Sequence, residues 1–455
     1  MRKTEKKNSF ALSPTFTVLM SFVLVISIGS VLLMMPFSSS ERSFTNPLTA
    51  VFTSVSATCV TGLTVVDTGL HWSRFGQIII LLMIQVGGIG LVTFASFVNF
   101  ILHRKMELHT IKLAADSAGA TFSDVKSMIK RIVGSVLIAE AIGMILLALY
   151  FVPRYGSPGL FLSLFLSVAA FCNAGFDVTS IYEVSGMSLE PYADNPYILT
   201  VLSVITIMGG LGFYVWTDLM EYRKTKKITF LTKLILISEA VLFILGGLYF
   251  TISEWSNPAT FGDFPIWQKI INGFFYSVTT RSAGFFTVPE AGLTNDSTML
   301  GIAWMFIGCA SGSTGGGIKT TTFAIIAVTI WCVIRGKSDT LLFGRRVDKD
   351  LVYKAFSIMM LSALVVAVTT LVILNTNPPE KIGALDAAFE ATSAFGTCGI
   401  PTGLEASLSV PSRLALCLTM LIGRVGPVTF AASLAIRQSK NNKSTTYPEA
   451  KIVVG

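Results

Sequence analysis

The sequence has 455 residues, of which 52% are hydrophobic and only 13% are charged, and its mean hydropathy is +0.69. A water-soluble domain of this length cannot cover its surface with so few charged side chains, so a small soluble enzyme is excluded. The long apolar runs instead predict a multi-pass membrane protein, because one bilayer-spanning helix takes about 20 residues.

The net charge of +8 raises the question of a nucleic-acid partner, but the distribution of the basic residues argues against one. Of the 34 lysines and arginines, 25 lie in five separate segments: 1–10, 103–131, 221–233, 335–354 and 437–455. Basic segments of membrane proteins stay on the cytoplasmic side, so these segments and both termini are predicted to be cytoplasmic. The opposite side carries acids such as Asp177 and Glu183, which concentrate cations locally.

Apolar spans come in pairs along the chain. First spans are predicted at about 15–35, 131–152, 230–252 and 352–374, and second spans at about 74–102, 196–220, 298–334 and 411–436. They define four consecutive units, residues 1–110, 111–227, 228–345 and 346–455. Each unit crosses the membrane twice and returns to the same side, so the units are expected around an axis along the membrane normal.

One pattern recurs between the two spans of every unit. The four copies read FTSVSATCVTGL (52–63), FLSVAAFCNAGF (165–176), FFYSVTTRSAGF (274–285) and FEATSAFGTCGI (389–400). In each copy a phenylalanine stands ten residues before a glycine, and the glycines are separated by 113, 109 and 115 residues. An ordinary extracellular loop is the alternative explanation, but four copies with one offset argue against it.

Each copy is too short to span a bilayer, and its backbone must still find hydrogen-bond partners at membrane depth. A half-helix that enters the membrane and ends in an extended strip against a central cavity meets this requirement. The predicted fold is therefore an all-α polytopic membrane protein. It has four repeats of first span, pore helix and second span, which give eight transmembrane helices and four re-entrant half-helices around a pseudo-fourfold pore.

The strips are predicted to form a K⁺ selectivity filter. Rings of backbone carbonyls replace the hydration shell of K⁺, and glycine adopts the backbone angles that turn carbonyls toward an axis. The strips differ in side chains and carry no ring of carboxylates, which favours selection by main-chain oxygens. Glycines that only permit tight turns are the alternative. The K⁺-binding candidates are Val60, Thr61, Gly62, Asn173, Ala174, Gly175, Ser282, Ala283, Gly284, Thr397, Cys398 and Gly399.

Glycine-rich stretches also mark the second spans. Gly87-Gly88-Ile89-Gly90 and Gly209-Gly210-Leu211-Gly212 are expected to allow close helix packing. The second span of the third unit differs, because no helix would be stable through its glycine-rich run 308–317. This run is predicted to be a flexible plug below the filter. It is also the only clear break expected among the second spans. The gate candidates are Gly312, Ser313, Thr314, Gly315, Gly316, Gly317, Lys319 and Arg424. A phosphate-binding loop ending at Lys319 is the competing interpretation, but its spacing is wrong.

Two arginines stand in unusual places. Arg424 lies within an apolar span, where a charge costs at least about 2.5 kcal/mol; it is predicted to face the water-filled path and repel cations there. The alternative is a structural ion pair with Glu140 or Glu239. Arg281 stands three residues before a strip glycine, and it is expected behind the filter, paired with Glu390 or another outer acid.

Together, the four strips, the broken third unit and Arg424 resemble the Trk/Ktr/HKT superfamily of cation transporters, in particular bacterial KtrB- and KtrD-type membrane subunits. The resemblance implies K⁺ uptake across the cell membrane, a homodimer of two pores, gating by a cytosolic RCK (KtrA-type) nucleotide-binding ring, and stimulation by Na⁺. Glycine at all four filter positions matches the K⁺-selective pattern of the family, in which serine at the first copy accompanies a preference for Na⁺. The gating roles are carried onto residues 308–317 and Arg424.

Other classes of function fit the sequence less well. The chain has no nucleotide-binding fingerprint of its own, so any nucleotide control is expected from the partner ring. A Na⁺- or H⁺-coupled carrier of another solute would need paired broken helices with acids at a central site. A membrane enzyme would need converging catalytic side chains, whereas the six cysteines are expected to be small buried hydrophobes.

Overall fold

The computed structural model describes residues 14–90, 125–182, 188–380 and 382–434. This part of the chain is predominantly helical; its strands β1 (Leu341–Leu342) and β2 (Arg345–Arg346) form one short antiparallel hairpin. The predicted all-α class is confirmed.

Each unit consists of a long first helix, a pore helix and a second helix. The first helices are α1 (Pro14–Met34), α7 (Val125–Tyr155), α11 (Phe230–Ser253) and α15 (Lys349–Thr376). The pore helices are α2 (Pro47–Cys59), α8 (Ser157–Phe171), α12 (Ile266–Thr279) and α16 (Ala384–Gly396). The second helices begin with α4 (Arg74–Ile89), α9 (Pro196–Gly210), α13 (Asn295–Phe306) and α17 (Val410–Val425).

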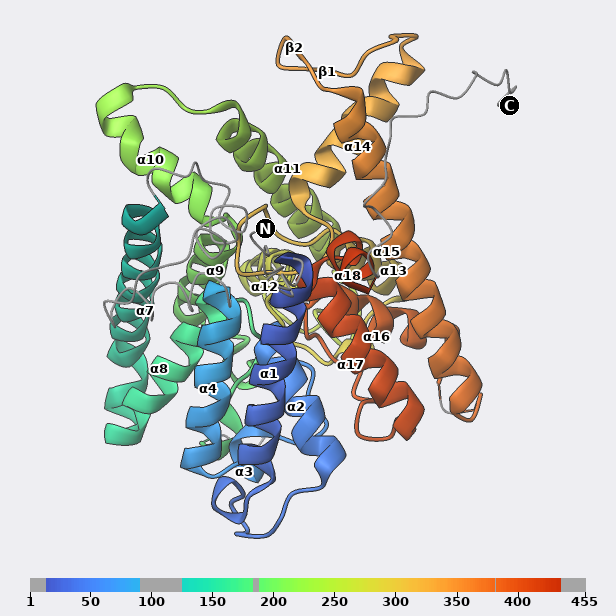
Figure 1. The fold of residues 1–455 in the computed structure, drawn as a ribbon. Coiled ribbons are helices and arrows are strands. Elements are labelled where there is room, and N and C mark those ends of the chain that lie inside the picture. Colours follow the sequence, from blue (N-terminus) through green and yellow to red (C-terminus); the bar gives the residue numbers. More distant parts are fainter. Residues whose placement is uncertain (1–13, 91–124, 183–187, 381, 435–455) are drawn as a thin grey trace, which may run out of the picture.

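Shorter elements connect or extend these helices. They are α3 (Thr68–His71), α10 (Phe213–Thr225), α14 (Thr320–Ile334), α18 (Pro427–Leu434), and the 3₁₀ turns η1 (Pro36–Ser38), η2 (Thr179–Ile181), η3 (Glu190–Tyr192) and η4 (Glu290–Gly292). The β1–β2 hairpin and α14 lie at the opposite end of the molecule from α3 (Figure 1).

The first helices carry the apolar outer surface. Within the described residues, α1, α7, α11 and α15 are long and apolar enough to cross a bilayer, and α9 with α10 adds a fifth, bent span. Large apolar side chains on these helices are exposed, among them Leu24, Leu149, Leu248 and Leu371. Water would disfavour such a surface, whereas lipid solvates it. The arrangement is that of a multi-pass membrane protein.

The second helices of units two and four are interrupted as well as that of unit three, which differs from the continuous spans expected there, and the described part of α4 in unit one ends before Gly90. The glycines Gly90, Gly212 and Gly426 have φ of +89°, +86° and +92° at these points, where an α-helix cannot continue. The chain turns by 94° between α9 and α10. The expectation that only unit three is broken is therefore wrong. Residues 91–102 of the first predicted second span lie outside the described residues.

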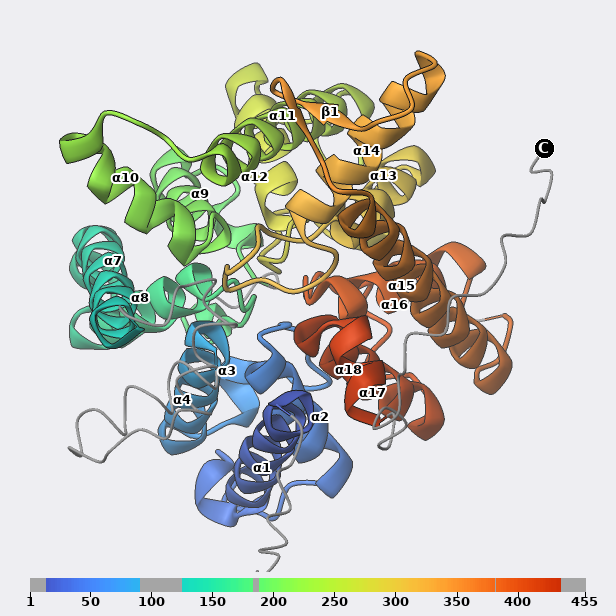
Figure 2. The ribbon, with the colours of Figure 1, turned by 45° about the horizontal axis from the view of Figure 1, so that its top comes forward.

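The four units surround a common centre (Figure 2). The first helices α1, α7, α11 and α15 lie toward the outside, and the pore helices run inward. The phenylalanine that opens the repeated pattern is fully buried in α2 and α8 as Phe52 and Phe165, and almost fully in α16 as Phe389. The corresponding Phe274 of α12 is half-buried, so burial of this aromatic residue anchors three of the four pore helices.

Candidate functional site: the glycine ring and the loop beneath it

Every pore helix ends in the same backbone turn. The residue two positions before the strip glycine is left-handed in all four copies, although none of them is glycine: Val60, Asn173, Ser282 and Thr397 have φ between +46° and +66°. In three copies the next residue's N–H closes the helix by bonding a carbonyl five residues back, as Thr61 bonds Ser56 at 2.8 Å. This is the hydrogen bond of a Schellman cap, which here turns the chain into the strip.

Gly62, Gly175, Gly284 and Gly399 form a closed ring, called here the glycine ring. A methyl group on Gly62 would lie 2.5 Å from the carbonyl oxygen of Ala174, and one on Gly175 would lie 2.7 Å from the Cα of Gly284. A methyl group on Gly284 would lie 2.6 Å from the carbonyl oxygen of Cys398, and one on Gly399 would overlap the carbonyl of Thr61. Each glycine thus faces the next strip, and the fourth faces the first.

Hydroxyl groups on the pore helices form hydrogen bonds with the main chain of three strips. The Oγ of Ser56 accepts a hydrogen bond from the N–H of Gly62 at 3.1 Å, and the Oγ of Ser393 accepts one from Gly399 at 3.1 Å. In unit three Thr279 donates to the carbonyl of Phe285 at 2.5 Å. These residues were not among the predicted site residues, although a serine stands six positions before the glycine in units one and four.

A cavity of about 270 Å³ opens on one side of the glycine ring, and all four ring glycines line it. Three acids also line it, Asp67, Asp177 and Glu405. Burial raises the pKa of Asp177 to about 6, and burial followed by the neighbouring Glu390 raises the pKa of Glu405 well above its usual value. This cavity is called here the acidic mouth. Its raised pKa values favour protonated carboxyls, so it attracts a cation less strongly than three ionised acids would.

The other side of the ring is covered by the central loop, residues 307–319 between α13 and α14. Ile307 and Ile318 form a parallel bridge, so the loop leaves and returns at neighbouring points. Its Thr314 donates a hydrogen bond to the Oδ1 of Asn173 at 3.0 Å, and the N–H of Gly316 donates to the Oγ1 of Thr397 at 2.9 Å. The loop is thus held against left-handed residues of two strips, and it is visible at the centre of Figure 2.

The predicted gate residues are spread along this loop. Gly312 and Gly317 have φ of +74° and +70°, which suits glycine. The N–H of Ser313 bonds the carbonyl of Ala310 at 3.2 Å, and the Nζ of Lys319 donates to the carbonyl of Gly315 at 2.7 Å. The loop therefore has a defined fold built from its own main chain.

A glycine stands at one fixed offset from the start of the second helix in every unit. In units one, two and four, the glycine that packs against the end of the pore helix stands thirteen positions after the first residue of the second helix: Gly87, Gly209 and Gly423. The same offset from the start of α13 gives Gly308. Gly308 is therefore the counterpart of these glycines, and the residues between Gly308 and Gly316 form an additional loop.

The guanidinium of Arg424 binds backbone carbonyls. It donates to the carbonyl of Thr314 in the central loop and to that of Gly87 in α4. Among the described residues no ion pair joins Arg424 to a carboxylate, so the alternative of an ion pair with Glu140 or Glu239 is wrong. Glu140 instead accepts a hydrogen bond from Gln85 at 2.9 Å.

Arg281 lies behind the strips, as expected, but the expected partner is wrong. Its guanidinium forms an ion pair with Glu239 of α11, with one N–O distance of 2.9 Å. It also donates to the carbonyl of Gly308 at 3.1 Å. Glu390 lies elsewhere and accepts from Thr402 at 2.8 Å. The positive charge next to the strip is therefore neutralised from the first helix of its own unit.

Comparison with known proteins agrees with this architecture. The family model "TrkH: Cation transport protein" matches residues 1–444. The chain is 34% identical to the potassium/sodium uptake protein NtpJ of Enterococcus hirae, covering 100% of this chain and 99% of that protein. It is 36% identical to the Ktr system potassium uptake protein B of Bacillus subtilis, covering 97% of each.

A solved structure resembles the whole fold. The potassium transporter TrkH from Vibrio parahaemolyticus aligns with a TM-score of 0.72 and 17% identity, covering 96% of this chain and 87% of that one. This likeness supports the arrangement of helices described above. From the family match over nearly its whole length, the chain belongs to the TrkH family of cation transport proteins.

Proposed function

We propose that this chain carries K⁺ into the cell through the glycine ring, in the manner of a channel. The closed ring of four glycines is the observation that carries the proposal, because it brings four main-chain strips to one point. The relatives that match the chain from end to end are named as potassium uptake proteins, and one of them as a potassium/sodium uptake protein. Transport needs no chemical step, since a unit charge gains about 2.3 kcal/mol per 100 mV of membrane potential.

The carbonyl groups of the strips are proposed to replace the hydration shell of K⁺. The carbonyl oxygens of Thr61, Ala174, Ala283 and Cys398 all lie beside the glycine of the preceding strip in the ring. Oxygens repeated around a closed ring have the geometry that dehydrated K⁺ requires. The ends of four pore helices add the negative ends of their dipoles.

The central loop and Arg424 are proposed to gate this path. The loop covers the side of the ring opposite the acidic mouth, and the charge of Arg424 is held against the loop by Thr314. A fixed positive charge below the ring opposes a passing cation. Opening then requires the loop and Arg424 to move together.

The cytosolic partner is proposed to be an RCK-type nucleotide-binding ring, because two relatives are Ktr system B proteins and hence parts of a multi-component system. The basic segments at the α14 end, including the hairpin residues Arg345 and Arg346, are proposed to face the cytoplasm with both termini. A homodimer and stimulation by Na⁺ belong to the same proposal.

A Na⁺- or H⁺-coupled carrier of another solute is the second candidate. The helix breaks at Gly212 and in the central loop favour this carrier function, because paired broken helices form the binding sites of carriers. Such a site also needs acids at the axis. The buried acids Glu140 and Glu239 contact Gln85 and Arg281 instead, which favours the channel-like mechanism.

The decisive experiment measures radioactive Rb⁺ uptake into proteoliposomes under an imposed inside-negative potential, with competing K⁺ or Na⁺. The proposal expects uptake that K⁺ suppresses more strongly than Na⁺ does, and a weaker preference for K⁺ in Gly62→Ser. Repeating the assay with a KtrA-type ring distinguishes a pore that opens only when the ring is bound from a protein that does not conduct cations. Absence of cation flux both with and without the ring would overturn the proposal.

A further inference from the structure

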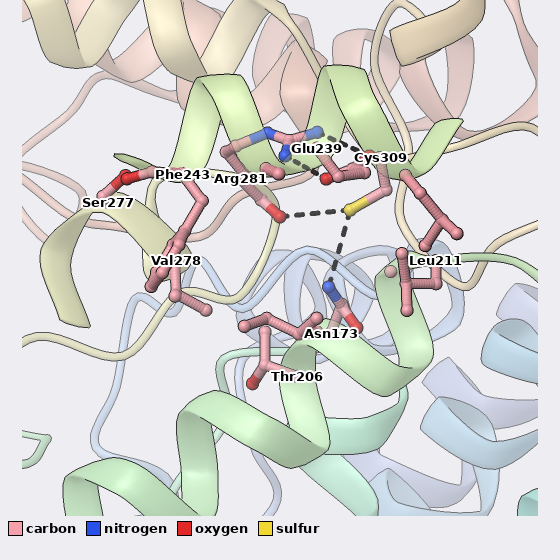
Figure 3. A pocket seen from close by; sticks show the side chains of 13 residues that line it. Asn173, Thr206, Leu211, Glu239, Phe243, Ser277, Val278, Arg281 and Cys309 are labelled. Atoms are coloured by element: carbon pink, nitrogen blue, oxygen red, sulfur yellow. Dashed lines mark hydrogen bonds and ion pairs between the residues drawn. The ribbon is translucent and has the colours of Figure 1, made fainter. Parts of the chain in front are cut away.

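A second cavity lies between units two and three, behind the strips. It has a volume of about 230 Å³ and is enclosed by α9, α11, α12 and the start of the central loop. Figure 3 shows the apolar side chains of Val278, Phe243 and Leu211 around it. The function proposed above makes no use of this cavity.

The inner wall of the cavity is built from residues of the strips. The Nδ2 of Asn173 lies 3.6 Å from the Sγ of Cys309, and that Sγ donates to the carbonyl of Arg281 at 3.1 Å (Figure 3). Asn173 is the left-handed residue of strip two, and Arg281 directly precedes its counterpart in strip three. Whatever fills the cavity therefore touches the groups that set the positions of two strips.

Several polar groups of this wall already have partners inside the protein, although the Nε of Arg281 has none. Glu239 neutralises Arg281, and Thr314 donates to the Oδ1 of Asn173. Water in the cavity would find few free hydrogen-bonding groups, and apolar cavities of this kind stay dry and take up apolar molecules. The occupant is expected to be apolar and uncharged.

The outer wall reaches the lipid-facing surface. Two lining residues, Ile207 of α9 and Ala240 of α11, are exposed. The residues beside them on the same helices, Val204 and Val241, are 50% and 47% exposed and do not line the cavity. These helices present an apolar outer face that lies in the hydrocarbon of the bilayer. The molecules that reach the cavity from this side are lipid chains.

We propose that this cavity binds an acyl chain of a membrane lipid, and that the chain supports the strips of units two and three at Asn173 and Arg281. An empty cavity would leave its lining without van der Waals partners, and an inserted chain restores these contacts. The lipid headgroup stays outside, since the charged side chains that line the cavity, Arg281 and Glu239, neutralise each other. Binding of the acyl chain in the cavity then influences how the strips of the glycine ring are arranged.

Photocrosslinking tests the binding site directly. The full-length protein is reconstituted in phosphatidylcholine vesicles that contain a trace of phosphatidylcholine with a diazirine on its acyl chain, and crosslinked residues are mapped by mass spectrometry. Ala240→Trp fills the cavity and is expected to lower crosslinking at Leu236 and Phe243 about tenfold. Val241→Trp places the same side chain on the outer face and is expected to leave it unchanged.

A second readout tests the coupling to the strips. Rb⁺ flux in Ala240→Trp is expected to change by about fivefold or more, the lower end of coupling between two sites, and to stay unchanged in Val241→Trp. Only this readout rests on the proposed K⁺ conduction; crosslinking does not depend on it. Leu236→Trp fills the cavity from another point and is measured in parallel with thermal unfolding, so that a misfolded variant does not decide the outcome.

Two results would overturn the proposal. Equal crosslinking of Phe243 in wild type, Ala240→Trp and Leu236→Trp would show that no chain enters the cavity. Loss of crosslinking with unchanged Rb⁺ flux in folded variants would show that the chain binds without acting on the strips, which rejects the coupling.

Discussion

The guanidinium of Arg424 in α17 donates a hydrogen bond to the main-chain carbonyl of Thr314 in the central loop. The same group donates to the carbonyl of Gly87 in α4. One side chain of unit four therefore ties the loop of unit three to the second helix of unit one. Since carbonyl dipoles stabilise the buried charge, the loop and the arginine are expected to shift as one.

Arg424→Gln is expected to raise Rb⁺ flux into proteoliposomes in the absence of a cytosolic partner by about tenfold, which corresponds to about 1.4 kcal/mol. Glutamine removes the charge that opposes the cation and one of the bonds that hold the loop. Arg424→Lys keeps the charge without the forked geometry that reaches two carbonyls, so a smaller increase is expected. Unchanged flux in both variants, with normal thermal unfolding, would contradict the gating role.

Gly399→Ala is expected to abolish Rb⁺ flux. Gly399 has φ of +83°, and a methyl group there would overlap the carbonyl of Thr61. Gly403→Ala is the matched control, because Gly403 has φ of +85° but no atom within 4 Å of an added methyl group. Both substitutions strain the backbone by about 1 kcal/mol or more, and only the first disturbs the ring. Equal loss of flux in the two variants would contradict the ring as the conducting site.

The sequence predicts the ring because its signal is local. The phenylalanine on the half-helix and the glycine in the strip that follows it stand ten residues apart, so one repeated pattern places both the buried anchor and the strip. The left-handed turn at Val60 or Thr397 could not be predicted from residue type, since neither residue favours that conformation. There the cap hydrogen bonds of the pore helix decide the backbone.

Contacts between helices were not predictable in the same way. Arg281 and Glu239 lie 42 positions apart, and their pairing depends on how α11 packs against α12, which no local pattern fixes. The helix end at Gly90 and the break at Gly212 were missed for a related reason: a glycine in an apolar span is compatible both with close packing and with a break. Gly87 and Gly209 do pack closely, while three positions later Gly90 caps the end of α4 and Gly212 caps the start of α10.

Glu239→Gln is expected to destabilise the protein by about 3–5 kcal/mol, because it leaves the buried Arg281 without a counter-charge. The side chains of the pair are only 7% and 17% exposed, so water cannot compensate. The double substitution Arg281→Met with Glu239→Leu is expected to recover most of this loss, since apolar side chains of similar size often replace a buried pair without cost. Thermal unfolding in detergent measures both. A double variant as unstable as Glu239→Gln would show that the hydrogen bond from Arg281 to Gly308 matters more than charge balance.

Acidic pH is expected to lower uptake at subsaturating K⁺, with a midpoint near pH 6. Burial raises the pKa of Asp177 to about 6, so this carboxyl at the mouth of the ring is charged at pH 7 and neutral at pH 5. Asp177→Asn is expected to flatten the profile between these values, while Asp194→Asn, an exposed acid outside the mouth, is expected to keep the wild-type profile.

The stability of the fold is expected to depend on the protonation of Asp177 in the opposite direction from uptake. An acid whose pKa is raised by folding stabilises the fold below its unfolded pKa of about 3.9, and this contribution is lost as pH rises through about 6. The melting temperature of the wild type relative to Asp177→Asn is therefore expected to fall between pH 5 and pH 7, while uptake rises. A wild-type and Asp177→Asn pair with parallel uptake and melting profiles would exclude Asp177 as the titrating group.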